Sequence, residues 1–261
     1  MKAKQIRQQF FDELKDAKDF GLRNNRPLVT VAYAQSLDGS IASWDRSKLQ
    51  LSGSESLDLT HQLRASHDAV LLGSGTALRE DPRLTVRRGI EGPQPIPVIL
   101  DSRLRISPDA RIFNEPSRIP ILVVNSDLPE KLMNDFSPDR ARILPCRGCP
   151  NGNLDLVALL SLLVHEGIFS LMVEGGIQVI TSFMALRIPD WLVVTVVPAM
   201  AGGLPALEGL GPRQPGCVRL LDWAWEARGE DMVVWTRPQW SSGHHRDRFE
   251  TKRDCDESKS D

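Results

Sequence analysis

The stretch from Leu171 to Phe183, LMVEGGIQVITSF, places a carboxylate and two glycines where a buried strand would turn into a helix. A glycine pair at such a junction allows a tight turn and lets a phosphate approach the main-chain N–H groups. The positive end of the following helix dipole would face the same point. Gly175 and Gly176 therefore indicate a phosphate site, and a second interpretation, that they only permit close helix–sheet packing, stays open.

Glu174 precedes this pair, at the tip of the expected strand. A carboxylate in that position loses hydration unless hydrogen-bond donors or a cation meet it. It would either bind N–H or hydroxyl groups of a ligand or cap a neighbouring loop. We favour the ligand.

Three other expected strands also end in glycine, hydroxyl or charged residues. The segments that follow them are AQSLDGSIA with Ser36 and Asp38, LLGSGTALRE with Gly73 and Thr76, and ILDSRLR with Ser102, Arg103 and Arg105. Ligands bind outside the carboxyl ends of parallel strands, so these segments would meet at one site. The two arginines would suit an anionic group such as an adenosine 2′-phosphate, although ordinary turns and solvated arginines remain alternatives.

A metal site is not expected. Cys146 and Cys149 form a CxxC, but a structural zinc site needs two further ligands, usually a second closely spaced pair. Cys217 and Cys255 lie far apart, and the histidines form no metal-binding spacing. Reduced thiols in a cytoplasmic protein are the simplest interpretation.

The elements that must position these residues alternate along the chain. Short apolar runs bounded by Gly, Pro, Asp or Asn predict strands at residues 28–34, 68–73, 96–102, 119–125, 170–175 and 191–200. Helical patterns cover residues 54–66, 154–167 and 177–187, and residues 220–238 suggest a terminal hairpin. Because the runs are apolar throughout, the strands should be covered on both faces, in a mostly parallel sheet between helices.

The chain ends differ from this body. Residues 1–26 predict an amphipathic helix with Ile6, Phe10, Leu14 and Ala17 on one side, which needs either the domain or a second subunit as its partner. Residues 238–261 are polar and charged, so we expect a disordered tail. A net charge of −2 argues against nucleic-acid binding, and no apolar run approaches the ~18 residues that span a bilayer. The first residues contain no apolar core of the signal-peptide type.

Four of these segments, taken in order, resemble the reductase domain of the riboflavin-biosynthesis deaminase/reductase family, in its free-standing form. They are AQSLDGSIA, LTHQLRASHDAVLLGSGTALREDPRLTVR, VILDSRLR and LMVEGGIQVI, and the resemblance spans residues 27–237. It implies a dihydrofolate-reductase-like three-layer α/β sandwich, NADPH as hydride donor and a homodimer. The implied reaction reduces the ribosylamino group of a pyrimidine 5′-phosphate to ribitylamino.

The resemblance also implies roles for individual residues. Cofactor contacts would fall on Ala34, Gly73, Thr76, Glu80, Ser102, Gly175, Gly176, Ile177, Gln178, Val179, Ile180, Thr181 and Ser182. Substrate contacts would fall on Arg64, Leu84, Arg87 and Glu174, and a substrate phosphate would suit the two guanidinium groups. The reaction also needs a proton donor, for which Asp38 and Glu174 are both candidates, acting directly or through a water.

Two positions depart from the family pattern. Glu80-Asp81-Pro82 stands where the family has Asp-Asp-Pro, and Lys48-Leu49-Gln50 stands where bifunctional members have a Ser-x-Trp segment. The second departure leaves the identity of the substrate open. Two alternative functions therefore remain: a reductase of another heterocycle or carbonyl compound on the same fold, and a ligand-binding homologue without catalysis.

Overall fold

The computed structural model describes residues 1–133, 135–150, 152–209 and 218–240. A nine-stranded sheet forms its centre, in the order β10-β11-β8-β1-β7-β3-β4-β5-β6. The strands are β1 (Leu28–Ser36), β3 (Ala69–Gly73), β4 (Ile96–Leu100), β5 (Ile121–Asn125), β6 (Arg142–Cys146), β7 (Ser170–Val173), β8 (Trp191–Val197), β10 (Arg219–Arg228) and β11 (Asp231–Gln239). All pairings from β8 to β6 are parallel, and β11 and β10 add an antiparallel hairpin.

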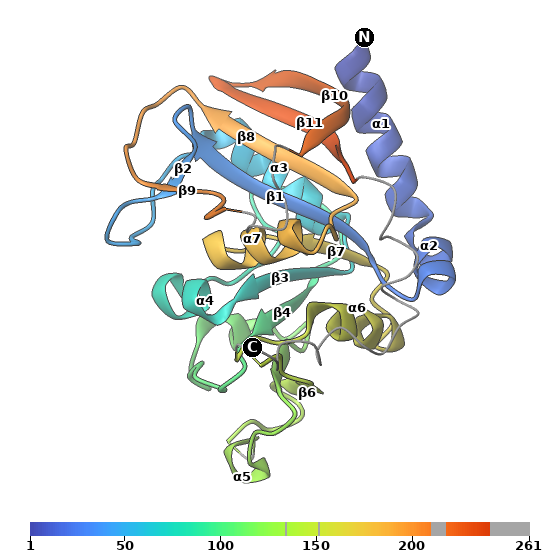
Figure 1. The fold of residues 1–261 in the computed structure, drawn as a ribbon, viewed down its shortest axis with the longest axis vertical. Coiled ribbons are helices and arrows are strands. Elements are labelled where there is room, and N and C mark those ends of the chain that lie inside the picture. Colours follow the sequence, from blue (N-terminus) through green and yellow to red (C-terminus); the bar gives the residue numbers. More distant parts are fainter. Residues whose placement is uncertain (134, 151, 210–217, 241–261) are drawn as a thin grey trace, which may run out of the picture.

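Helices cover both faces of this sheet, which confirms the predicted three-layer α/β arrangement. Helix α1 (Lys2–Lys15) and helix α3 (Ser54–Ala65) contribute to one apolar cluster, with Phe10, Leu59 and Leu63 buried. Helix α6 (Leu156–His165) and helix α7 (Ile177–Ala185) contribute to the other. In Figure 1, α3 lies behind the sheet and α7 in front of it. None of the described helices is long and apolar enough to cross a membrane.

Every strand expected from the sequence forms, with shifted ends. The strand expected at 170–175 ends at Val173, so Glu174 lies just beyond it, and the strand expected at 191–200 ends at Val197. Other elements were not predicted: β6, which carries Cys146; the small β2 (Ser40–Ala42) and β9 (Leu204–Pro205) pair; and the short helices α4 (Ser74–Glu80), η1 (Arg111–Asn114) and α5 (Glu130–Met133). Most are too short to show a helical or strand period.

The N-terminal helix is two helices, because the chain bends at Asp16 before α2 (Ala17–Asn24). The four residues expected on one side are all buried. Phe10 packs with ring centroids 5.4 Å from Trp191 and 5.2 Å from Trp235, so the helix covers the β8 and β11 end of the chain's own sheet. The tail expected at 238–261 lies outside the described residues from position 241 onward.

Candidate active site

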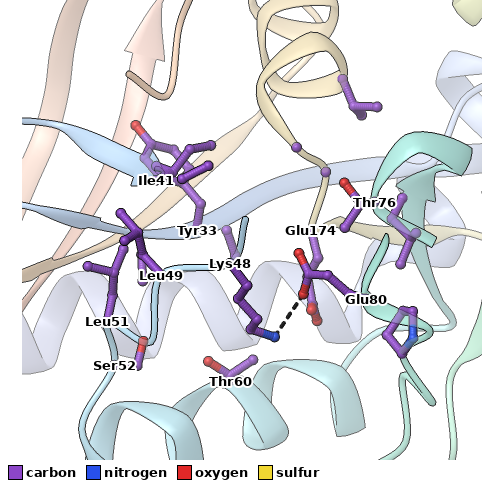
Figure 2. Close-up of a pocket in the computed structure, with 18 of the residues that line it drawn as sticks. Tyr33, Ile41, Lys48, Leu49, Leu51, Ser52, Thr60, Thr76, Glu80 and Glu174 are labelled. Atoms are coloured by element: carbon purple, nitrogen blue, oxygen red, sulfur yellow. Dashed lines mark hydrogen bonds and ion pairs between the residues drawn. The ribbon is translucent and has the colours of Figure 1, made fainter. Parts of the chain in front are cut away.

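A cavity of about 700 Å³ opens beside the carboxyl ends of β3 and β7. One wall comes from α3 through Thr60, Leu63 and Arg64, and another from the β7–α7 junction. The segment from Arg46 to Ser52 lines the remaining side. Figure 2 shows Thr76 and Glu174 facing this cavity, with Tyr33 and Leu49 across from them. The expected convergence of strand ends is therefore observed for β3 and β7.

Glu174 and Arg64 form a bidentate ion pair in this cavity. The Nε and Nη2 atoms of Arg64 each donate to one carboxylate oxygen of Glu174, both at 2.6 Å. Burial alone would lower the pKa of Arg64, but the charge and hydrogen bonds of Glu174 outweigh it and raise that pKa. Two such bonds between ions orient both side chains, so Glu174 presents its remaining lone pairs in a fixed direction. The Glu174 carboxylate, just beyond β7, is thus held in position to accept hydrogen bonds from a ligand.

Arg87 supplies a second positive charge to the cavity, and its guanidinium has different partners from that of Arg64. It lines the cavity, and its guanidinium donates a hydrogen bond to the hydroxyl of Thr85 at 3.2 Å. Burial, followed by the charges of Arg64, Arg83, Arg111 and Arg88, lowers the pKa of Arg87. A cluster of like charges around an arginine that faces a cavity favours an anionic ligand there.

The double glycine serves close packing as well as access. A Cβ atom on Gly175 would lie 2.4 Å from Cβ of Val179, and one on Gly176 would lie 2.7 Å from Oγ1 of Thr76. Both glycines line the cavity together with the first turn of α7, which has no side-chain cap. The main-chain N–H groups of this turn are therefore placed to meet an anion. The two interpretations of the glycine pair describe one arrangement.

The two departures from the family pattern contact each other. Nζ of Lys48 lies 2.8 Å from Oε2 of Glu80, and both side chains line the cavity. Figure 2 marks this pair with a dashed line. The Lys48 side chain is 68% exposed, so solvent screens the pair.

Most of the predicted site residues line this cavity. They are Ala34, Gly73, Thr76, Glu80, Arg64, Leu84, Arg87, Glu174, Gly175, Gly176, Ile177, Gln178 and Val179. Ser102, Ile180, Thr181 and Ser182 are not among its lining residues. Ile180 is fully buried in the α6/α7 core, Thr181 accepts a hydrogen bond from the Glu208 N–H, and Ser182 donates to the Gln178 carbonyl. The side chains of these three residues are therefore engaged outside the cavity.

Asp38 is also outside the cavity lining. Its carboxylate accepts hydrogen bonds from the hydroxyl groups of Ser36 and Ser40 and from the N–H groups of Ala201 and Gly202. These bonds, led by that of Ser36, hold its pKa well below the usual range. The structure uses Asp38 to join two loops, and a carboxylate so stabilised as an anion is a poor proton donor.

Arg105 is engaged as well, by the Asp101 carboxylate at 3.3 Å and the Ser74 hydroxyl at 2.5 Å. Arg103 is exposed. The interpretation of these arginines as an anion site remains a prediction.

His61 is a site residue whose role the sequence did not indicate. It is 3% exposed, and its Nδ1 atom accepts a hydrogen bond from the N–H of Arg87 at 3.2 Å. Burial, then the nearby Arg64 and Arg87 charges, lowers its pKa to about 4. The neutral ring therefore carries its proton on Nε2. The spacing of three residues from Arg64 on one helix was the available signal.

No group of His, Cys, Asp and Glu side chains able to hold a metal ion occurs in the described part of the chain. Cys146 is buried, and burial raises its pKa to about 11. A thiol in that state stays protonated and is a weak nucleophile at neutral pH.

The chain is similar to known proteins over most of its length. Residues 27–234 match the family model described as the RibD C-terminal domain. A 2,5-diamino-6-ribosylamino-4(3H)-pyrimidinone 5′-phosphate reductase from Archaeoglobus fulgidus is 35% identical over 187 residues, which is 68% of this chain and 83% of that protein. The protein of the same name from Methanothermobacter thermautotrophicus is 34% identical over 80% of this chain and 97% of its own length.

Longer proteins match over part of their length. The riboflavin biosynthesis protein RibD of Aquifex aeolicus is 31% identical over 82% of this chain, but the chain covers only 58% of that protein. Among solved structures, the riboflavin biosynthesis reductase Rib7 of Saccharomyces cerevisiae superposes with a TM-score of 0.66 at 28% identity, covering 82% of this chain and 91% of that one.

Proposed function

The chain belongs to the RibD C-terminal domain family, and from this premise we propose that it is an NADPH-dependent reductase of riboflavin biosynthesis. In this proposal it converts the ribosylamino group of a pyrimidine 5′-phosphate to the ribitylamino form. The observation that carries the proposal is a single cavity that joins the glycine-lined start of α7 to the Arg64–Glu174 pair and Arg87. One half suits a dinucleotide and the other a phosphorylated sugar.

The described residues fit NADPH. The cavity edge at Gly73, Gly175 and Gly176 has no room for side chains, and the α7 amides and the Thr76 hydroxyl face the same space. These groups would hold the diphosphate, and the bound cofactor supplies the hydride. The main chain of residues 180–182 is engaged within α7, where the Ile180 N–H donates to the Gly176 carbonyl. We therefore keep these residues and Ser102 as contacts only if the elements around the cavity move when the cofactor binds.

The substrate would occupy the half of the cavity beside α3. Arg87 would bind its phosphate, and Leu84 would pack against its apolar surface and exclude water. Glu174, held as an anion by Arg64, would accept hydrogen bonds from the opened sugar or the pyrimidine and would orient a water that supplies the proton. Of the two residues considered for proton transfer only Glu174 lines the cavity, because Asp38 is tied to two loops away from it.

The pyrimidine we propose still carries its 2-amino group. The archaeal relatives that match most of this chain are named for the 2,5-diamino compound. Incubating the purified protein with NADPH and either the diamino or the deaminated pyrimidine tests both points. We expect absorbance at the nicotinamide band to fall faster with the diamino compound. No loss with either substrate would refute the proposed activity, and a preference for the deaminated one would refute the assignment of the substrate.

Binding of the cofactor can be tested apart from turnover. A ligand present at 100 times its dissociation constant stabilises the native state by about 2.7 kcal/mol, so NADPH should raise the melting temperature measurably. NADH at the same concentration should raise it less. If neither NADPH nor NADH raises the melting temperature, the alternative of a ligand-binding homologue without catalysis is favoured.

We further propose a homodimer in the cytoplasm. Strand β10 is an edge of the sheet (Figure 1). Four apolar residues on it are between 43% and 54% exposed: Leu220, Leu221, Trp223 and Trp225. Large apolar side chains on an edge strand favour a protein partner. Light scattering should give twice the mass of one chain, and a Trp223→Ser/Trp225→Ser variant should give the mass of one.

A further inference from the structure

The segment from Arg83 to Arg88 contributes Leu84 and Arg87 to the substrate half of the cavity and forms neither a helix nor a strand. Side chains from elsewhere in the chain form hydrogen bonds with the main chain of most of its residues. Gln94 bonds both the N–H and the carbonyl of Val86, at 2.8 and 2.9 Å. Arg64 donates to the Thr85 carbonyl, and His61 accepts from the Arg87 N–H. The conformation of this segment is therefore held by hydrogen bonds to side chains and not, in the residues that the structure describes, by hydrogen bonds between main-chain groups.

Arg118 holds the start of this segment. Its Nη2 atom donates to the carbonyl of Arg83, and its Nη1 atom donates at 2.8 Å to the carbonyls of Leu84 and Pro95. The residue is 7% exposed. All these acceptors are main-chain carbonyls, and the buried Nε atom has no acceptor among the described residues. A buried guanidinium is costly, so its presence under a loop calls for a reason.

Leu84 provides that reason. Its φ is +51°, in the left-handed region that bulky residues rarely adopt, and its side chain is buried against the cavity. Such a conformation costs on the order of 1–3 kcal/mol and persists only where the surroundings impose it. The carbonyl that Arg118 binds belongs to this same residue. Asp81 and Arg88, on either side, also have positive φ values.

Burial lowers the pKa of Arg118 to about 10. The side chain is therefore still protonated at neutral pH and retains its donors there. A planar guanidinium presents several N–H groups at fixed angles, whereas a lysine offers one rotatable ammonium. The pattern of carbonyls around Arg118 uses the planar geometry.

We propose that Arg118 is a positioning residue for substrate binding: it holds Leu84 in its strained conformation and thereby sets the path of the chain to Arg87. The inference rests on the proposed function, because it names the residue that shapes the substrate half of that site. Arg118 is absent from the cavity lining, so it acts through the loop and touches no ligand itself.

The test compares Arg118→Met and Arg118→Lys with a matched control, Arg142→Met. Arg142 lies on the far edge strand β6 and pairs with Glu166 at 2.8 Å, so its loss removes a guanidinium remote from the cavity. We expect both Arg118 variants to raise the KM for the phosphorylated pyrimidine about ten-fold or more. The kcat and the KM for NADPH should change by less than about three-fold. Arg142→Met should match the wild type in all three.

Three results would overturn the proposal. One is an unchanged KM for the pyrimidine in Arg118→Met. Another is an equal change in kcat and in both KM values, which would mean that the substitution disturbs the whole site and not the substrate half. Recovery by Arg118→Lys to wild-type KM would also contradict it, because then charge alone would be sufficient and the planar geometry would not matter.

A second measurement separates this inference from the proposed function. If the wild type does not oxidise NADPH, hydrogen exchange at the amides of Val86 and Arg87, both hydrogen-bonded in the structure, still reports on the loop. Faster exchange in Arg118→Lys than in Arg142→Met supports the positioning role without any substrate. Equal exchange in the two variants refutes it.

Discussion

Replacing the Arg64–Glu174 pair by apolar residues should separate stability from activity. The side chains are 11% and 16% exposed, so each ion has lost most of its water and depends on the other. Removing one partner of a fully buried pair costs about 3–5 kcal/mol, and because these side chains keep some solvent contact we expect about 2 kcal/mol for Arg64→Met or for Glu174→Leu. The double variant leaves no unpaired ion and should lie within about 1 kcal/mol of the wild type.

Urea unfolding of the four proteins measures this directly. The expected single and double effects give a coupling free energy of about 3–5 kcal/mol between the two side chains. Denaturation midpoints are compared only if the m-values agree, since a changed m-value signals a changed native or denatured state. NADPH oxidation by the same proteins should be lost in all three variants, including the stable double variant.

The outcome that refutes this reasoning is a coupling free energy near zero. The two side chains would then contribute independently, and the pair would have no bearing on how the carboxylate is oriented. Wild-type turnover by the double variant would refute the functional half alone. It would mean that the family fold supplies the activity without an acceptor at the tip of β7.

Three further predictions follow from buried side chains. His67 is buried, and burial lowers its pKa to about 4, so the unfolded chain binds the proton more tightly between that pH and 6.5. The free energy of unfolding should therefore fall by about 2 kcal/mol from pH 7 to pH 5. A difference in stability between wild type and His67→Gln that does not depend on pH would contradict this. Phe10→Ala should destabilise by about 3–5 kcal/mol, because Phe10 is fully buried against Trp191 and Trp235, whereas Leu22→Ala on the exposed face of α2 should change little by the same thermal unfolding assay. Gly175→Ala should destabilise by about 1–3 kcal/mol and weaken NADPH binding measured by calorimetry, because the new Cβ would lie 2.4 Å from Cβ of Val179. Adding Val179→Ala should recover little, since alanine retains that Cβ. A fully stable single variant would show that α7 can move aside.

The sequence was sufficient for the sheet and its layers. Strands such as residues 96–100 and 121–125 are continuous apolar runs, and a strand covered on both faces has no other composition. The N-terminal helix was equally clear, because its four apolar residues recur at helical spacing and all four are buried. Local composition determines these elements, so a single sequence contains the information.

The parts that were not predicted depend on contacts between distant residues. Strand β6 contains a proline and two residues facing outward or partly exposed, so its composition does not distinguish it from a loop until it pairs with β5. The shape of residues 83–88 depends on His61, Gln94 and Arg118, none of which is adjacent in sequence. Asp38 followed a strand as expected, but whether its carboxylate faces a ligand or a second loop depends on residues 201 and 202.

Lys48 and Glu80 show why departures from the family pattern at the mouth of the site must be interpreted together and not one position at a time. Considered separately, each is a departure from the family pattern, and each removes or alters an expected contact. In the structure the longer acidic side chain reaches a lysine that replaces a small hydroxyl residue, at 2.8 Å. An exposed pair of this kind contributes about 0–1 kcal/mol to stability, so stability does not explain it. It does place a positive charge beside the Glu80 carboxylate in the cavity lining, where polyanionic ligands would enter. The two departures therefore act together, and Lys48→Ala should weaken binding of NADPH more than Glu80→Ala does.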